Sequence, residues 1–128
     1  MLKKTIKYTD FNGVEREEDF YFNLTEAELF DMNLSKDGGL QDYIQAIVKS
    51  NNSVEISKFF RSVIDKAYGV KSADGKHFEK SERTLAAFKS TQAYSDLYVG
   101  FLTNADEAAD FMKQIIPAKY QAQLKEVK

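Results

Sequence analysis

The feature that most constrains the fold is the Asn12-Gly13 pair, which stands between two runs of alternating residues near the start of the chain. Such a pair is typical of a tight β-hairpin turn. A two-residue loop would place the apolar residues of the two runs on opposite faces. A three-residue loop, with Gly13 in the left-handed region as a G1 bulge, pairs Asp10 with Val14 instead. The bulged register is favoured because it gathers the apolar residues on one face.

This register predicts two chemically different faces. The apolar face carries Leu2, Ile6, Tyr8, Val14, Phe20, Phe22 and Leu24. The polar face carries Lys3, Thr5, Lys7 and Thr9 on one strand and Glu15, Glu17, Asp19 and Tyr21 on the other. Lys7 is then expected directly opposite Glu17. Since a two-stranded ribbon is marginal in water, its apolar face should pack on the helices that follow.

The hairpin leads straight into a helix start. Thr25 and Glu28 have the spacing of a capping box, and Leu24 can pack against Leu29 as a hydrophobic staple. A first helix is therefore predicted over about residues 25–34.

Helical spacing of apolar residues recurs along the rest of the chain. The predicted helices cover about 40–48, then 52–67 with Asn52 as N-cap, a segment that resumes at Ser81, then 93–102, and a last one from Thr103 or Asn104 to Pro117. Gly69 stands where the residue after a helix C-terminus belongs.

The main interruption between helices is the Asp74-Gly75 pair, which predicts a tight turn of a short ribbon anchored by Val70 and Phe78. These patterns together predict an α+β fold that is predominantly α-helical, with an N-terminal β-hairpin packed on five to six helices. We expect a single domain over residues 1–117 and a mobile or frayed helical tail over 118–128.

Composition and motifs narrow the function by exclusion. The 128 residues carry a formal net charge of −2 and no cysteine, which argues against a general nucleic-acid binder and against a thiolate metal site. No stretch has the apolar length of a signal peptide or a membrane span. His77 is interpreted as a solvated loop residue, and the acids around Glu17 as a solvated face. We therefore predict no enzymatic activity, no metal and no cofactor.

Aromatic residues make up 13% of the chain, and several recur at helical spacing. Such a stripe is most often core, but tyrosine is also favoured at protein interfaces. Both interpretations stay open from sequence, and Tyr94, Tyr98 and Phe101 are the candidates for contact with a partner.

Three segments in a fixed order carry a family resemblance. They are YTDFNGVEREEDFYFNLTEAEL, AYGVKSADGKHFEKS and FKSTQAYSDLYVGFLTNADEAADFMKQIIP. Their order and content resemble the tail assembly chaperones of long-tailed phages and of prophages in Gram-positive bacteria. The resemblance extends to Pro117, and the segment beyond it looks longer than the usual ending of that family.

The resemblance implies a non-enzymatic protein of the host bacterial cytoplasm that binds the tape measure protein and is absent from the mature virion. It also implies displacement by tail tube subunits, and a longer frameshifted form that engages the tail tube protein. The hairpin is then either a lid on the helices or an edge for self-association by strand addition. The alternative function is that of a structural virion component, such as a tail completion or head-to-tail joining protein.

Overall fold

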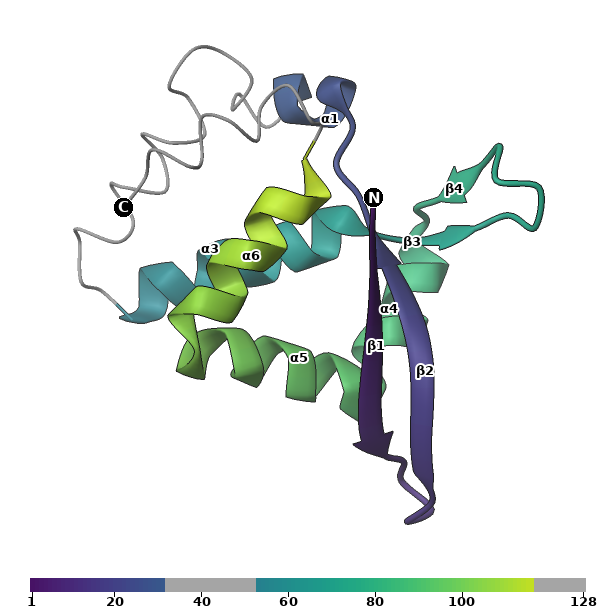
Figure 1. Ribbon diagram of the computed structural model, residues 1–128, viewed down its shortest axis with the longest axis vertical. Coiled ribbons are helices and arrows are strands. Elements are labelled where there is room, and N and C mark those ends of the chain that lie inside the picture. Colours follow the sequence, from purple (N-terminus) through teal and green to yellow (C-terminus); the bar gives the residue numbers. More distant parts are fainter. Residues whose placement is uncertain (32–52, 117–128) are drawn as a thin grey trace.

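A computed structural model describes residues 1–31 and 53–116 (Figure 1). The predicted helix over 40–48, the predicted cap at Asn52 and the predicted tail over 118–128 lie outside these residues. The described elements are β1 (Leu2–Thr9), β2 (Glu15–Phe22), α1 (Glu26–Asp31), α3 (Ser53–Ala67), β3 (Tyr68–Lys71), β4 (Phe78–Glu79), α4 (Glu82–Lys89), α5 (Gln92–Thr103) and α6 (Ala105–Ile115). The predicted α+β class, with an N-terminal hairpin and a helical remainder, is confirmed.

The hairpin has the predicted bulged register. Lys7 pairs with Glu17 in the β1–β2 ladder, and Gly13 has a φ of 81°. The amide of Asp10 donates to the carbonyl of Val14 at 2.9 Å. The sequence pattern did not predict the role of the Asp10 side chain, whose Oδ1 accepts from the amides of Asn12 and Val14. This carboxylate holds the loop in one conformation.

The predicted apolar face is confirmed at its centre and wrong at one end. Ile6, Phe22 and Leu24 are buried, and Leu2, Tyr8 and Phe20 pack against the same core. Val14 is 52% exposed, because the loop end of the hairpin projects beyond the helices (Figure 1).

Two further strands extend the sheet to the order β1-β2-β3-β4. The predicted ribbon around Asp74-Gly75 is confirmed as the β3–β4 hairpin, but its attachment to β2 was not predicted. Gly69 lies in strand β3 and not at a helix C-terminus. The ring of Phe78 covers Gly69 so closely that a β-carbon there would lie 2.6 Å from it. Val70 is 44% exposed and is therefore not the predicted anchor.

The helix starts follow the sequence signals. The amide of Glu28 donates to Thr25 Oγ1 while the amide of Thr25 donates to Glu28 Oε1, which confirms the first capping box. Ser81 caps α4, and Asn104 caps α6 through the amide of Glu107 at 3.1 Å. Each cap satisfies an amide that the first helical turn leaves without a partner.

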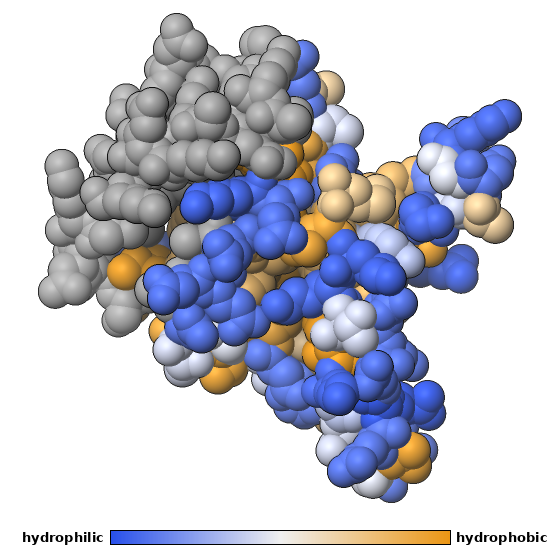
Figure 2. Space-filling view, in the orientation of Figure 1, coloured by the Kyte–Doolittle hydropathy of each residue, from blue (hydrophilic) through white to orange (hydrophobic). Residues whose placement is uncertain are grey.

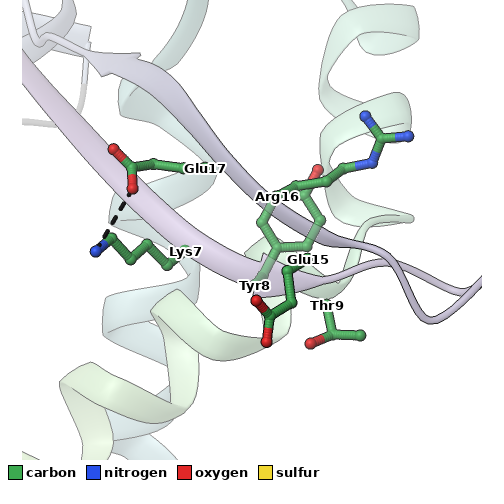
Figure 3. Close-up of a pocket in the computed structure, with 6 residues that line it drawn as sticks. All are labelled: Lys7, Tyr8, Thr9, Glu15, Arg16 and Glu17. Carbon is green, nitrogen blue, oxygen red and sulfur yellow. Dashed lines mark ion pairs between the residues drawn. The ribbon is translucent and has the colours of Figure 1, made fainter.

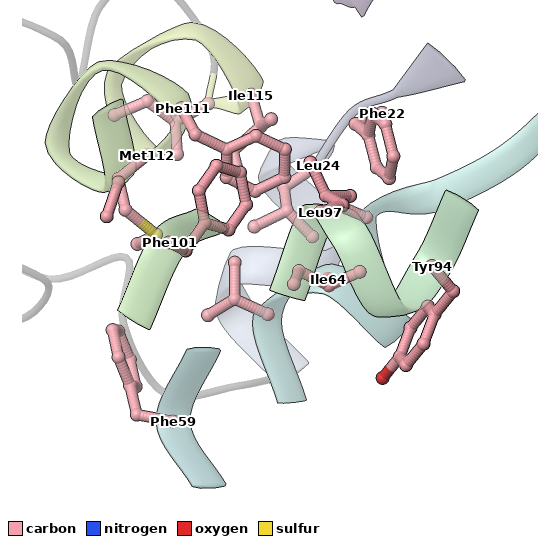
Figure 4. Packing of buried hydrophobic residues seen from close by; sticks show 14 of the residues in the cluster. Phe22, Leu24, Phe59, Ile64, Tyr94, Leu97, Phe101, Phe111, Met112 and Ile115 are labelled. Carbon is pink, nitrogen blue, oxygen red and sulfur yellow. The ribbon is translucent and has the colours of Figure 1, made fainter. Parts of the chain in front are cut away.

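One continuous core joins the hairpin to the helices (Figure 4). The ring of Phe22 lies 5.2 Å from the ring of Phe111 in α6 and 6.0 Å from that of Phe88 in α4. Phe101 of α5 in turn lies 4.6 Å from Phe111. The hairpin thus covers one side of the core, and helices cover most of the rest.

Candidate partner-binding surface

The candidate site lies along the line where α3 and α5 pack against each other. Tyr94 Oη donates to Asp65 Oδ1 at 3.0 Å, and the guanidinium of Arg61 stacks 4.8 Å from the ring centre of Tyr98. Positions on α5 rise as their partners on α3 fall, so the two helices run antiparallel. One side of each helix therefore forms part of a shared outer surface.

The structure separates the three aromatic residues that the sequence grouped together. Tyr94 is 8% exposed and Phe101 only 2%, so both lie in the core (Figure 4). Burial, reinforced by the hydrogen bond to Asp65, raises the pKa of Tyr94 well above its ordinary value. Tyr98 is only partly buried. Of the three, Tyr98 therefore has the most accessible side chain.

Other apolar side chains on the same two helices are exposed, and the sequence did not single them out. Leu102 lies one helical turn beyond Tyr98 on α5 and is 43% exposed. Val54 lies two turns before Arg61 on the same side of α3 and is 56% exposed. We call the surface formed by Val54, Arg61, Tyr98 and Leu102 the α3–α5 face. Partial exposure of large apolar groups on adjacent helices is a feature of protein-binding surfaces.

The face shown in Figure 2 is mainly hydrophilic, with separate apolar patches. One such patch is at the loop of the β1–β2 hairpin, where Phe11 is 78% exposed.

A shallow pocket of about 450 Å³ lies between the outer parts of β1 and β2 (Figure 3). Its lining is polar and charged, and Lys7 and Glu17 reach toward each other across the strands, with Lys7 Nζ 3.5 Å from Glu17 Oε2.

Within residues 1–31 and 53–116, no group of three or more histidine, cysteine, aspartate or glutamate residues is placed to hold a metal ion. His77 is exposed in the β3–β4 loop.

A partly buried ion pair joins three segments of the chain. Lys80 Nζ donates to the carbonyl oxygens of Asn23 and Lys66, at 2.6 and 2.8 Å, and to Glu28 Oε2 at 2.6 Å. The single ammonium group therefore joins the end of β2, the C-terminus of α3 and the first turn of α1. Its side chain is 21% exposed and that of Glu28 is 25% exposed.

The pKa values of this pair reflect burial and hydrogen bonding together. Burial lowers the pKa of Lys80, although the carboxylate of Glu28 partly offsets the effect. Burial alone would raise the pKa of Glu28, but the hydrogen bonds from Lys80 and Thr25 outweigh it and hold that pKa below its ordinary value. The lowered pKa keeps Glu28 ionised near neutral pH.

The described residues thus combine exposed apolar side chains on two adjacent helices with no cluster that could hold a metal ion. A sequence model of the family described as phage tail assembly chaperone matches residues 1–128, and the chain belongs to this family. No curated protein sequence and no solved structure shows significant similarity to it. Among the described residues, no helix has the length and apolar character needed to cross a bilayer.

Proposed function

We propose that this tail assembly chaperone binds the tape measure protein and keeps it soluble until tail tube subunits polymerise around it. The observation that carries the proposal is the α3–α5 face, where Val54, Tyr98 and Leu102 are accessible along two antiparallel helices. A paired-helix surface of this kind can receive the apolar stripe of an amphipathic helix. A long helical client offers many such stripes.

The composition of the face also fits a client that must be released. Its apolar groups are few, so each copy contributes a modest share of the binding free energy. Displacement by tail tube subunits then requires only that many weak contacts be exchanged one by one. In this proposal the protein acts without catalysis, works in the host cytoplasm and is absent from the mature virion. A longer frameshifted form would carry the contact with the tail tube protein.

The test is co-expression with the tape measure protein encoded beside this gene. We expect the client to remain in the soluble fraction, in a complex with several copies of this chain. The double variant Tyr98→Ala/Leu102→Ser should lose the complex. The matched control is Val14→Ser/Val70→Ser, which removes comparably exposed apolar groups from the two hairpins and should keep it.

Two results would reject the proposal. One is a client that stays equally soluble without this protein. The other is a purified virion that contains this chain at a fixed copy number, which would favour the structural virion component instead. Raising the salt concentration should weaken the complex little, because salt mainly screens exposed charges.

A further inference from the structure

Within residues 1–31 and 53–116, the outer edge of β2 has no neighbouring strand along most of its length. β3 pairs with β2 only at Tyr21 and Phe22. Beside residues 15–20, no other strand of the described chain lies on that side. In Figure 1 this part of β2 runs past the helices toward the projecting loop. An unpaired edge of this length is a template for strand addition.

The direction of the backbone groups on this edge follows from two hydrogen bonds. The amide of Asp10 donates to the carbonyl of Val14, so even-numbered residues of β2 face β1. The amide of Asn23 donates to the carbonyl of Ala67, so odd-numbered residues face the other side. Because these directions alternate along a strand, residues 15, 17 and 19 point their N–H and C=O groups away from β1.

The three side chains on this edge are all acidic: Glu15, Glu17 and Asp19. They share the polar face of the hairpin, where β1 already places hydrogen-bond donors opposite two of them. Lys7 faces Glu17, and Thr5 Oγ1 donates to Asp19 Oδ1 at 2.6 Å.

Near Tyr21, at the inner end of the polar face, β2 does have a neighbouring strand on its outer side. There β3 lies beside β2, and Lys71 Nζ is 5.6 Å from the ring centre of Tyr21. Both strands that flank β2 thus present lysine to its polar face. Opposite charges directly across a pair of strands are favourable, whereas like charges are unfavourable.

We propose that the edge of β2 over residues 15–19 binds an extended segment of a different polypeptide, with Lys or Arg at every second position. Backbone hydrogen bonds to residues 15, 17 and 19 provide the attachment. The acidic side chains select the basic partner. At about 3.4 Å per residue, a partner segment of five residues spans the edge.

A second copy of this chain fits the edge poorly. Two β2 edges would place acid against acid, and two β1 edges would place lysine against lysine. A β1 edge meeting a β2 edge matches the charges, but residues opposite each other share a face of the sheet. The helices of both copies would then lie on the same side of the joined sheet, with the two hairpins about 10 Å apart, which is two strand spacings. Because one helix is about that wide and each copy contains several, the two copies would clash.

The experiment uses a capped eight-residue peptide of alternating Lys and Val as the probe. Binding is measured by titration while the amide resonances of the protein are followed by NMR. We expect changes centred on residues 15, 17 and 19. Two control peptides test specificity: one has the same composition with four Lys before four Val, and the other alternates Glu and Val.

Three variants of the edge separate backbone pairing from charge. Glu17→Pro and Glu17→Ala both remove the carboxylate, but only Glu17→Pro also removes an N–H that the β1 ladder does not use, a place where an edge strand tolerates proline. Glu17→Pro should therefore bind the alternating Lys peptide roughly tenfold more weakly than Glu17→Ala, as expected for one lost backbone hydrogen bond. Glu15→Lys/Glu17→Lys/Asp19→Lys should reverse the preference toward the Glu peptide. The matched control, Glu82→Lys/Asp96→Lys/Asp106→Lys, makes the same change in net charge on exposed helix positions and should keep the original preference.

Several results would overturn the proposal. The block peptide binding as well as the alternating one would indicate attraction by charge alone. A folded Glu17→Pro variant with the same affinity as Glu17→Ala, or no binding of the alternating peptide at millimolar concentration, would exclude strand addition. Self-association that the Glu17→Pro variant abolishes would identify a second copy as the occupant. The variants of the α3–α5 face leave this edge intact, so failure of client binding and failure of strand addition are distinguishable.

Discussion

Replacing Lys80 with methionine tests whether one ammonium group holds three segments together. The substitution keeps an unbranched side chain of similar length but removes three donated hydrogen bonds, to Asn23, Glu28 and Lys66. An exposed ion pair contributes about 0–1 kcal/mol, and breaking a fully buried one costs about 3–5 kcal/mol. With both side chains roughly one quarter exposed, the expected cost lies between these limits, at about 2–3 kcal/mol.

The assay is urea unfolding of the wild type, Lys80→Met, Glu28→Gln and the double variant, all at pH 7. Lys80→Met leaves the carboxylate of Glu28 without its ammonium partner, so the double variant should be less destabilised than the sum of the single variants. The folded-state pKa of Glu28 is lowered, so its contribution is present above the ordinary glutamate value near 4.3 and is lost as the pH falls through the lowered pKa. The reasoning would be refuted if the unfolding free energy of Lys80→Met lay within about 0.5 kcal/mol of wild type. It would also be refuted if the losses of the two single variants added up to that of the double variant.

Four further substitutions give expected outcomes in thermal or urea unfolding. Phe20→Asp places a charge against the core and should cost several kcal/mol, whereas Glu17→Lys changes an exposed pair and should cost under about 1 kcal/mol; the reverse order would contradict the assigned faces. Gly69→Ala should destabilise by about 1–3 kcal/mol, because the new methyl group displaces the Phe78 ring, and a neutral result would show that the ring moves freely. Tyr94→Phe should cost about 1 kcal/mol at pH 8, and since the folded-state pKa is raised, the difference should shrink as the pH rises above about 10; a constant difference would exclude this titration.

Local signals were sufficient to predict the hairpin and the helix starts. The register follows from the alternation around Asn12-Gly13, and the capping box of Thr25 and Glu28 joins residues three positions apart. Such features depend on neighbours in sequence, so they can be identified without knowing the tertiary structure.

The remaining features depend on residues far apart in sequence. The bond from Lys80 to Asn23 spans 57 positions, and nothing near Lys80 distinguishes it from other lysines. Helical spacing placed Tyr94, Tyr98 and Phe101 on neighbouring faces, but only the position of α3 decides which of them is covered. Gly69 resembled a helix terminus because the close approach of Phe78 becomes apparent only once the β3–β4 hairpin is formed.

The packing of the first strand against the last described helix determines when this domain can be completed during translation. Lys4 of β1 pairs with Glu107 of α6 at 2.9 Å across 103 positions, and the amide of Leu24 donates to the carbonyl of Ile115. At bacterial synthesis rates of about 5–20 residues per second, the hairpin waits on the order of 5–20 s for α6 to emerge. During that interval the apolar face around Ile6 and Phe22 lacks part of its cover. The folded domain is therefore available to a client only after α6 has left the ribosome.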